Sequence, residues 1–165
     1  MLDETLRSIQ MFLYPMPQGE LLRETRWAWP IFESLHFLGM SLLLGTVGIF
    51  DLRLLGFARR IPVAALHKLI PIGIAGFAMN ALTGISFLSA TPDQYLFNRA
   101  FYWKVAFFVV AGVNVMVFYA RTFRRLLDTE PGAPPPLGAR IAGGVSLIAW
   151  IGVMSAGRLL TFFRP

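Results

Sequence analysis

The sequence contains no cysteine among its 165 residues, which excludes disulfide bonds, thiolate metal sites and cysteine nucleophiles. Charged residues are also scarce, because they make up 15% of the chain against about 25% in an ordinary soluble domain. Hydrophobic residues reach 56%, and the mean hydropathy is +0.60. The composition therefore predicts a polytopic membrane protein rather than a soluble core with a polar surface.

Four long apolar runs account for most of this hydrophobicity. Each run has the length that a helix needs to cross a bilayer at about 1.5 Å per residue, and lipid offers no partner to the backbone groups of any other open structure. We therefore expect one integral membrane domain over residues 1–165, an all-α antiparallel bundle of four transmembrane helices. The predicted spans are residues 29–54, 64–90, 100–123 and 139–163.

The segment before the first span has a different pattern. Leu2, Leu6, Ile9 and Leu13 recur at helical spacing, while charged residues lie largely on the other side. This pattern predicts a short amphipathic helix over residues 2–14 that lies on the membrane surface.

The excess of basic residues gives a net charge of +6, but it does not indicate a nucleic-acid partner. The basic residues fall at the ends of apolar runs, where they anchor helices and set topology. The dense basic pairs lie in the first and third connections. We therefore expect a multi-pass protein of the bacterial inner membrane, with those connections in the cytoplasm and both termini in the periplasm. The expected partners are lipid, other membrane subunits or a second copy of the chain.

Ionisable and polar residues inside the spans are the best functional candidates, because they are costly in lipid unless they are paired, wetted or ligated. Counting inward from the outer helix ends places residues of all four spans at a shared depth in the outer leaflet. We expect them to form a polar site centred on His36. Its members are Glu33, His36, Thr83, Lys104 and Arg158, with Asn80 deeper.

Two stripes of small and polar residues are predicted to face protein, since small residues mark close helix contacts in membranes. One stripe holds Gly73, Gly76, Asn80, Thr83 and Gly84, and the other Gly144, Gly152, Ser155 and Arg158. A purely structural interpretation stays open for each group. The glycines then only pack, Asn80 and Asn114 bond between helices, Lys104 and Arg158 extend to headgroups, and Glu33 pairs with one of these cations.

The two histidines have different interpretations. His36 is a candidate ligand, or else a neutral imidazole bonded to Glu33 or to a hydroxyl. His67 is expected to be a surface histidine at the opposite membrane face, roughly 20 Å away along the helices. That separation argues against a haem held between the two. A haem b with His36 as one ligand stays open, with Lys104 and Arg158 at its propionates and Met40 or Met79 as a second ligand.

Several strings of the sequence resemble those of a family of small bacterial four-helix membrane proteins of unknown function. The shared pattern is E-x-L-H early in the first span, D-L-R-L-L-G at its exit, T-G in the second, K near the start of the third, and G-R in the fourth. Relatives often have Phe-His where this chain has Phe118 and Tyr119, so if relatives use that histidine as a ligand, this chain lacks it. The early histidine and Lys104 are also similar to the copper-resistance D membrane domain and to haem-dependent membrane protoporphyrinogen oxidases. This resemblance implies a redox or metal-handling site.

Three functional hypotheses follow. The first is an electron-transfer protein or subunit that binds haem b or a quinone, with His36 as ligand and Glu33, Lys104 and Arg158 around it. The second is an accessory subunit of a larger membrane complex that has no cofactor. The third is copper handling, because His36 and Met40 share a helix face and suit Cu(I). Hydrolase chemistry is disfavoured, since no span presents a nucleophile–histidine–acid group at a shared depth.

Overall fold

The computed structural model describes residues 2–130 and 132–163. This part of the chain is helical and contains no strand, which confirms the predicted all-α bundle. Its elements, in chain order, are α1 (Leu2–Leu13), α2 (Pro17–Glu24), α3 (Ala28–Leu55), α4 (Val63–His67), α5 (Ile70–Ala90), α6 (Pro92–Leu96), α7 (Arg99–Val117), η1 (Phe118–Thr122), α8 (Phe123–Leu127) and α9 (Leu137–Leu159).

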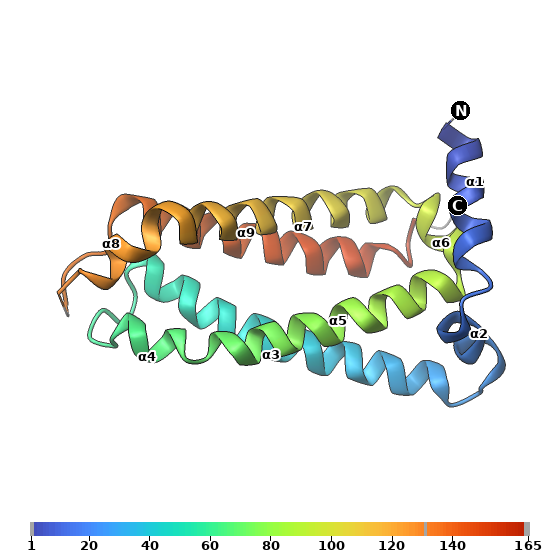
Figure 1. The fold of residues 1–165 in the computed structure, drawn as a ribbon, viewed down its shortest axis with the longest axis horizontal. Helices are drawn as coiled ribbons and strands as arrows, with labels where there is room; N and C mark the ends of the chain where they lie inside the picture. Colours follow the sequence, from blue (N-terminus) through green and yellow to red (C-terminus); the bar gives the residue numbers. More distant parts are fainter. Residues whose placement is uncertain (1, 131, 164–165) are drawn as a thin grey trace.

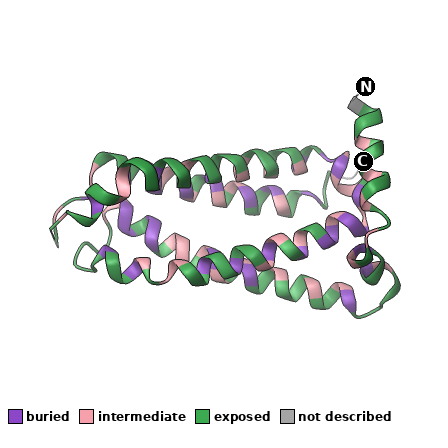
Figure 2. Cartoon of the chain, in the orientation of Figure 1, coloured by how far each residue is buried: buried purple, intermediate pink, exposed green. Residues whose placement is uncertain are grey.

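The four predicted spans correspond to helical stretches long and apolar enough to cross a membrane. These stretches are Ala28–Leu55, Val63–Ala90, Arg99–Leu127 and Leu137–Leu159. Protein buries only 11% to 33% of their most apolar windows, and Figure 2 shows exposed residues along the outer sides of the long helices. Apolar surface of this extent is stable in contact with lipid rather than with water. The chain is therefore a multi-pass membrane protein.

The first span ends where the sequence contains Gly56. This glycine has a φ of 102°, a left-handed conformation that side chains disfavour. The Gly56 amide donates to the carbonyl of Arg53, and the Phe57 amide donates to that of Leu52. These two bonds form a Schellman motif, which satisfies the last carbonyls of α3 and turns the chain back.

The second and third spans are both interrupted near the same end of the bundle. In the second span α4 and α5 are separate, and Pro71 lies in the first turn of α5, where its missing N–H costs least. In the third span α7 continues through η1, a turn of π-helix, into α8. We call this end of the molecule the α8 end and the opposite end the α6 end.

The long helices form two antiparallel pairs (Figure 1). In the first pair, α3 and α5 approach so closely that a Cβ on Gly76 would lie 2.7 Å from the carbonyl oxygen of Gly39. In the second pair, Gly152 of α9 accommodates the ring of Phe107 on α7. Asn114 of α7 donates to the carbonyl of Ala142 at 2.9 Å, which confirms the predicted bond between helices.

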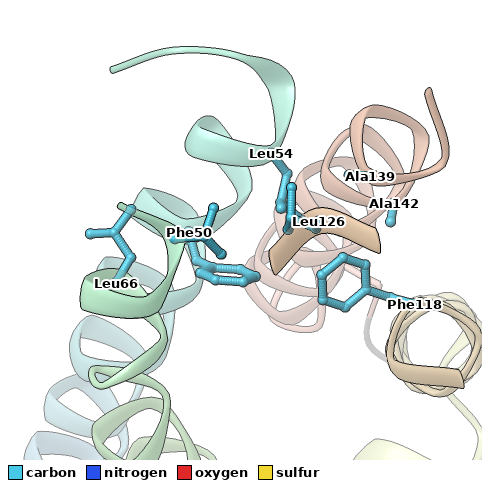
Figure 3. Close-up of a cluster of buried hydrophobic side chains, with 8 residues drawn as sticks. Phe50, Leu54, Leu66, Phe118, Leu126, Ala139 and Ala142 are labelled. Carbon is cyan, nitrogen blue, oxygen red and sulfur yellow. The ribbon is translucent and has the colours of Figure 1, made fainter. Parts of the chain in front are cut away.

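The two pairs join through α3 and α9 at the α8 end. A Cβ on Gly143 of α9 would lie 2.8 Å from the carbonyl oxygen of Asp51 on α3, so the two backbones nearly touch. Figure 3 shows the apolar cluster that fills this junction, contributed by the helices α3, α4, α8 and α9 and by η1. From there α3 slopes away from the α7–α9 pair toward the α6 end, whereas α5, which crosses α3, slopes toward that pair (Figure 1).

The N-terminal helices close the α6 end. Residues 2–13 form the predicted helix α1, which lies across the long axis of the bundle (Figure 1), with Met11 and Phe12 each 70% exposed. The sequence did not indicate α2. Gly19 of α2 packs against the backbone of Ser89, and Arg23 donates to the carbonyls of Ser89 and Ala90 at 3.0 and 3.3 Å. Arg23 thereby caps the C-terminus of α5, where a cation is favourable.

The small-residue stripe is confirmed on most of α5 but on α9 only at Gly152, which packs against Phe107. Gly73, Gly76, Asn80 and Thr83 are buried on α5, and Gly84 is half-buried. On α9, however, Gly144 and Gly152 are only half-buried, and Ser155 and Arg158 are exposed. Gly144 and Gly152 are eight residues apart, so they point about 80° away from each other. The buried face of α9 consists instead of Ala139, Ala142, Gly143, Ser146, Ala149, Val153 and Ala156.

Candidate functional site

His36 is held between the first two long helices. It lies in the third turn of α3 from the α6 end, and its Nδ1 is 2.7 Å from Oγ1 of Thr83 on α5. The edge of the imidazole meets the ring of Phe87, with 5.7 Å between centroids. The side chain is half-buried, and its Cε1 would lie 3.9 Å from a Cβ on Gly84. The sequence predicted Glu33 or a hydroxyl as the partner of a neutral His36, and the structure shows a hydroxyl, that of Thr83.

The hydrogen-bond network assigns the proton on the imidazole. Thr83 Oγ1 has one hydrogen, and it donates this hydrogen to the carbonyl of Met79 at 2.8 Å. With this bond made, its lone pair can accept from His36, and we therefore assign the tautomer in which Nδ1 carries the proton. The other nitrogen, Nε2, is then left with a free lone pair. This is the arrangement in which histidines bind metals, with the second ring nitrogen donating to a protein oxygen.

Asn80 lies one turn from Thr83 and belongs to the helix crossing. Its Nδ2 donates to the carbonyl of Gly76 at 3.0 Å, and this atom would lie 2.7 Å from a Cβ on Gly39. The described bond of Asn80 is therefore within α5 rather than across to another helix. Its Oδ1 is buried without a hydrogen-bond partner. One acceptor on the buried face of α5 thus stays unused on the same stripe as Thr83.

Lys104 brings a positive charge to His36 from the second helix pair. It is half-buried on α7, and its Nζ would lie 3.8 Å from a Cβ on Gly157 of α9. Its charge acts on the imidazole of His36, although the two residues belong to different helix pairs. The structure therefore places His36, Thr83 and Lys104 in one electrostatic neighbourhood, as the depth argument predicts.

Glu33 is not among the residues that the structure shows in contact with His36. Its side chain is exposed, and its charge acts on the Tyr95 hydroxyl. Burial, and to a lesser degree the Glu33 charge, raises the pKa of Tyr95 to about 12. Tyr95 was not singled out from the sequence, because an aromatic residue in a turn-rich connection carries no positional signal.

Arg158 and Met40 lie at the margin of this group. The Arg158 side chain is exposed on α9, and the described hydrogen bond of this residue is from Thr161 to its backbone carbonyl. Met40 is half-buried on α3, one turn beyond His36. In the described part of the chain, no three His, Cys, Asp or Glu side chains gather in a way that suits a metal ion. A metal at His36 would need its other ligands from Met40, a cofactor or a partner.

His67 lies partly at the surface, as the sequence indicated, but it also belongs to an aromatic cluster that the sequence did not indicate. It is half-buried at the α8 end, where its Nε2 lies 3.1 Å from the Tyr119 hydroxyl. Its ring packs on Phe123, with 4.7 Å between centroids, and its edge meets Phe50. The π-helical turn η1 carries Tyr119 into this aromatic cluster. The two histidines nevertheless lie at opposite ends of the bundle, as expected.

Two charged side chains at the α8 end were missed as candidates. Asp51 and Arg53 are only 3% and 4% exposed, and each has one buried polar atom without a partner, Oδ2 and Nη1 respectively. Ser146 of α9 is the hydrogen-bond partner of Asp51. Both residues lie at the end of a span, where charged residues are expected to set topology, so neither stood out as a candidate. No protein-family model, curated protein or solved structure matches this chain.

Proposed function

We propose that the protein transfers electrons in the bacterial cytoplasmic membrane and binds a haem b through Nε2 of His36. The observation that carries this proposal is the 2.7 Å contact between His36 Nδ1 and Thr83 Oγ1, because the tautomer that we assign from it leaves Nε2 unprotonated. An axial ligand to haem iron must present such a lone pair from a ring that is held in place. Bound at this position, the haem supplies a one-electron couple within the membrane.

The charge near His36 supports the same assignment. Haem propionates are anionic, and in lipid they need a cation close by. Lys104 is half-buried on the opposite helix pair and acts electrostatically on His36. It is thus the residue that we assign to a propionate. Arg158, one residue after the glycine that Lys104 contacts, is exposed and lies in the last turn of α9.

A quinone is the second candidate, and the same two groups favour it. Unprotonated Nε2 accepts a hydrogen bond from a quinol hydroxyl, and the Lys104 ammonium donates one to a quinone carbonyl. Copper would use His36 and Met40, which supply one imidazole and one thioether. Haem, quinone and copper therefore share His36 but differ in absorption, in extractable organic content and in metal content.

The basic character of the α8 end supports the proposed orientation. The connections between the first and second spans and between the third and fourth spans both lie there. Positively charged connections remain in the cytoplasm during insertion. We therefore place the α8 end in the cytoplasm and the α6 end, with His36, on the periplasmic side.

The absorption spectrum of the purified protein tests the haem assignment. We expect a Soret band in protein extracted from membranes in mild detergent, and loss of this band in His36→Ala. His67→Ala is the matched control, because it removes the other histidine from the opposite end of the bundle, and it should keep the band. Iron and copper analysis and chromatography of an organic extract separate the three cofactors.

Two results would contradict the proposal. One is a Soret band that survives His36→Ala. The other is a colourless protein that does not take up added haem and contains neither quinone nor copper. The second result would favour the cofactor-free accessory subunit.

A further inference from the structure

We propose that the α8 end contains a binding site for the phosphate of an anionic phospholipid, formed by Arg53 and Arg59. This site is distinct from the His36 group and lies at the other end of α3. It does not depend on the proposed electron-transfer function.

Arg53 carries a buried positive charge that protein groups only partly satisfy. Its side chain is 4% exposed, and its Nε and Nη2 donate to the carbonyls of Ile61 and Arg59 at 2.9 and 3.2 Å. Its Nη1 is buried without a partner. The groups that it contacts among the described residues are neutral carbonyls, so the charge itself has no counterion. A buried guanidinium is costly in this state.

Arg59 brings a second positive charge to the same place. It follows α3 in the turn after Gly56, donates from Nε to the Gly56 carbonyl at 3.0 Å, and acts electrostatically on Arg53. Its side chain is exposed. Like charges repel each other, and an anion bound beside them offsets that repulsion. The exposed Arg59 guanidinium is the group that donates to the phosphate oxygens, while the buried charge of Arg53 adds electrostatic attraction from beneath it.

The distribution of charge along the molecule favours an anion at this end. Arg53 and Arg59 belong to eight basic residues at the α8 end, which holds three acidic ones. The basic residues are Arg53, Arg59, Arg60, Lys68, Arg121, Arg124, Arg125 and Arg140, and the acidic ones are Asp51, Asp128 and Glu130. At the α6 end, six basic residues face six acidic ones among the described residues, Arg7, Arg23, Arg26, Arg99, Lys104 and Arg158 against Asp3, Glu4, Glu20, Glu24, Glu33 and Asp93.

The depth of the site selects a lipid over a soluble anion. Arg53 lies in the last turn of a membrane-spanning helix, and Gly56 ends that helix, so both arginines lie where lipid headgroups begin. Anionic headgroups concentrate at that level, and basic side chains beside them gain binding energy. The ligand is therefore a phospholipid phosphate with a net negative charge.

Lipid binding in nanodiscs tests this site. The thermal midpoint of the purified protein is measured in nanodiscs of pure phosphatidylcholine and in nanodiscs that contain phosphatidylglycerol, and bound phosphatidylglycerol is counted by native mass spectrometry. We expect phosphatidylglycerol to raise the midpoint and to remain bound. We expect Arg59→Gln to weaken its binding about fivefold. Arg60→Gln is the matched control, because it removes the same charge from the next position of the same exposed turn.

Three outcomes would overturn the proposal. The first is equal stability in the two kinds of nanodisc. The second is equal weakening by Arg59→Gln and Arg60→Gln, which would indicate a diffuse surface potential. The third is the same stabilisation by inorganic phosphate added to detergent-purified protein, which would indicate a soluble anion. Arg59 is the residue to change because it is exposed, whereas a change at buried Arg53 would also disturb the turn.

Discussion

Both histidines of this chain are bonded to hydroxyl groups, but the bonds leave different nitrogens free. Nδ1 of His36 is bonded to the Thr83 hydroxyl, which itself donates to a backbone carbonyl. His67 uses Nε2 toward the Tyr119 hydroxyl and is covered by aromatic rings. The free nitrogen of His36 is Nε2, the one that extends furthest from the helix. At the residue scale, this difference makes His36 the better ligand.

Thr83→Val tests the role of the hydroxyl that orients His36. The change keeps the shape of the side chain but removes the acceptor for Nδ1–H, so the ring loses both its orientation and its fixed tautomer. We expect the haem affinity to fall about 10- to 100-fold, with the fold retained. The measurement is a haem titration followed by the Soret band.

Thr46→Val is the control for this experiment. Thr46 lies on α3 and donates to carbonyls of its own helix, at Leu42 and Leu43. The Thr46→Val variant therefore loses an equivalent hydroxyl within the membrane, while the contacts of the His36 imidazole stay unchanged. Haem affinity that drops equally in both variants, or in neither, would show that Thr83 does not position the ligand.

The sequence predicted part of the site because depth can be counted along a helix. Counting 1.5 Å per residue brought His36 and Thr83 to the same depth, and their side chains do meet. It could not assign Arg158, because the angular position of a side chain depends on which face of its helix is buried. It also missed Tyr95, since nothing in a loop sequence shows where an aromatic ring will be buried.

At the scale of elements, the α3–α5 crossing determines where the site lies. Gly39 and Gly76 face each other with no room for a side chain, and this contact aligns the next turns, which carry His36 and Thr83. Small residues permit this approach in a membrane, where packing replaces the hydrophobic effect. The glycine spacing on α5 predicted the buried face correctly. The spacing on α9 did not predict its buried face, because residues eight apart lie at different angles around the helix.

Gly76→Ala tests this crossing. The added Cβ would lie 2.7 Å from the Gly39 carbonyl oxygen and 2.8 Å from the Leu43 amide nitrogen, both backbone atoms that cannot move alone. We expect the free energy of unfolding to fall by about 1–3 kcal/mol. Reversible unfolding in mixed micelles, followed by helicity, measures the change.

Gly45→Ala provides the comparison on α3. A Cβ at Gly45 meets nothing within 4 Å, so this variant changes only helix propensity, in the favourable direction. Unfolding free energies that fall equally in the two variants would exclude close packing as the role of Gly76.

The short helices were harder to predict than the long ones. The sequence predicted α1 from its apolar spacing, but α2 and α6 show no such periodicity over eight and five residues. Each begins at a proline, and α2 is fixed by tertiary contacts such as Arg23 with the end of α5. Isolated helices of this length are unstable, so contacts that are distant in sequence determine them.

For the molecule as a whole, the pattern of hydropathy determines the number of spans, and the distribution of charge is expected to determine the orientation of the protein in the membrane. Four apolar windows predicted four spans, because only helices satisfy their backbone in lipid. The two ends of the bundle differ mainly in charge, and the basic α8 end predicts which side faces the cytoplasm.

The absence of cysteine makes this orientation directly testable. Glu130→Cys and Glu24→Cys each introduce one exposed thiol, the first in the connection beside α8 and the second at the end of α2. We expect a membrane-impermeant maleimide to label Glu24→Cys in intact spheroplasts and to label Glu130→Cys only after lysis. The cysteine-free parent reports background labelling, and the reverse pattern would show the opposite orientation.

The close contact at Gly143 lies far from the other end of α9, so a small rotation at this contact would move that end by a larger distance. The pairs make their close backbone contact at the α8 end, and α9 extends about 24 Å from there toward the α6 end. Rotation of α9 by about 5° about its contact with α3 at Gly143 would shift the far tip of α9 by about 2 Å. Because Nζ of Lys104 lies beside Gly157 near this tip, such a shift would also change the distance between the Lys104 ammonium and the His36 imidazole.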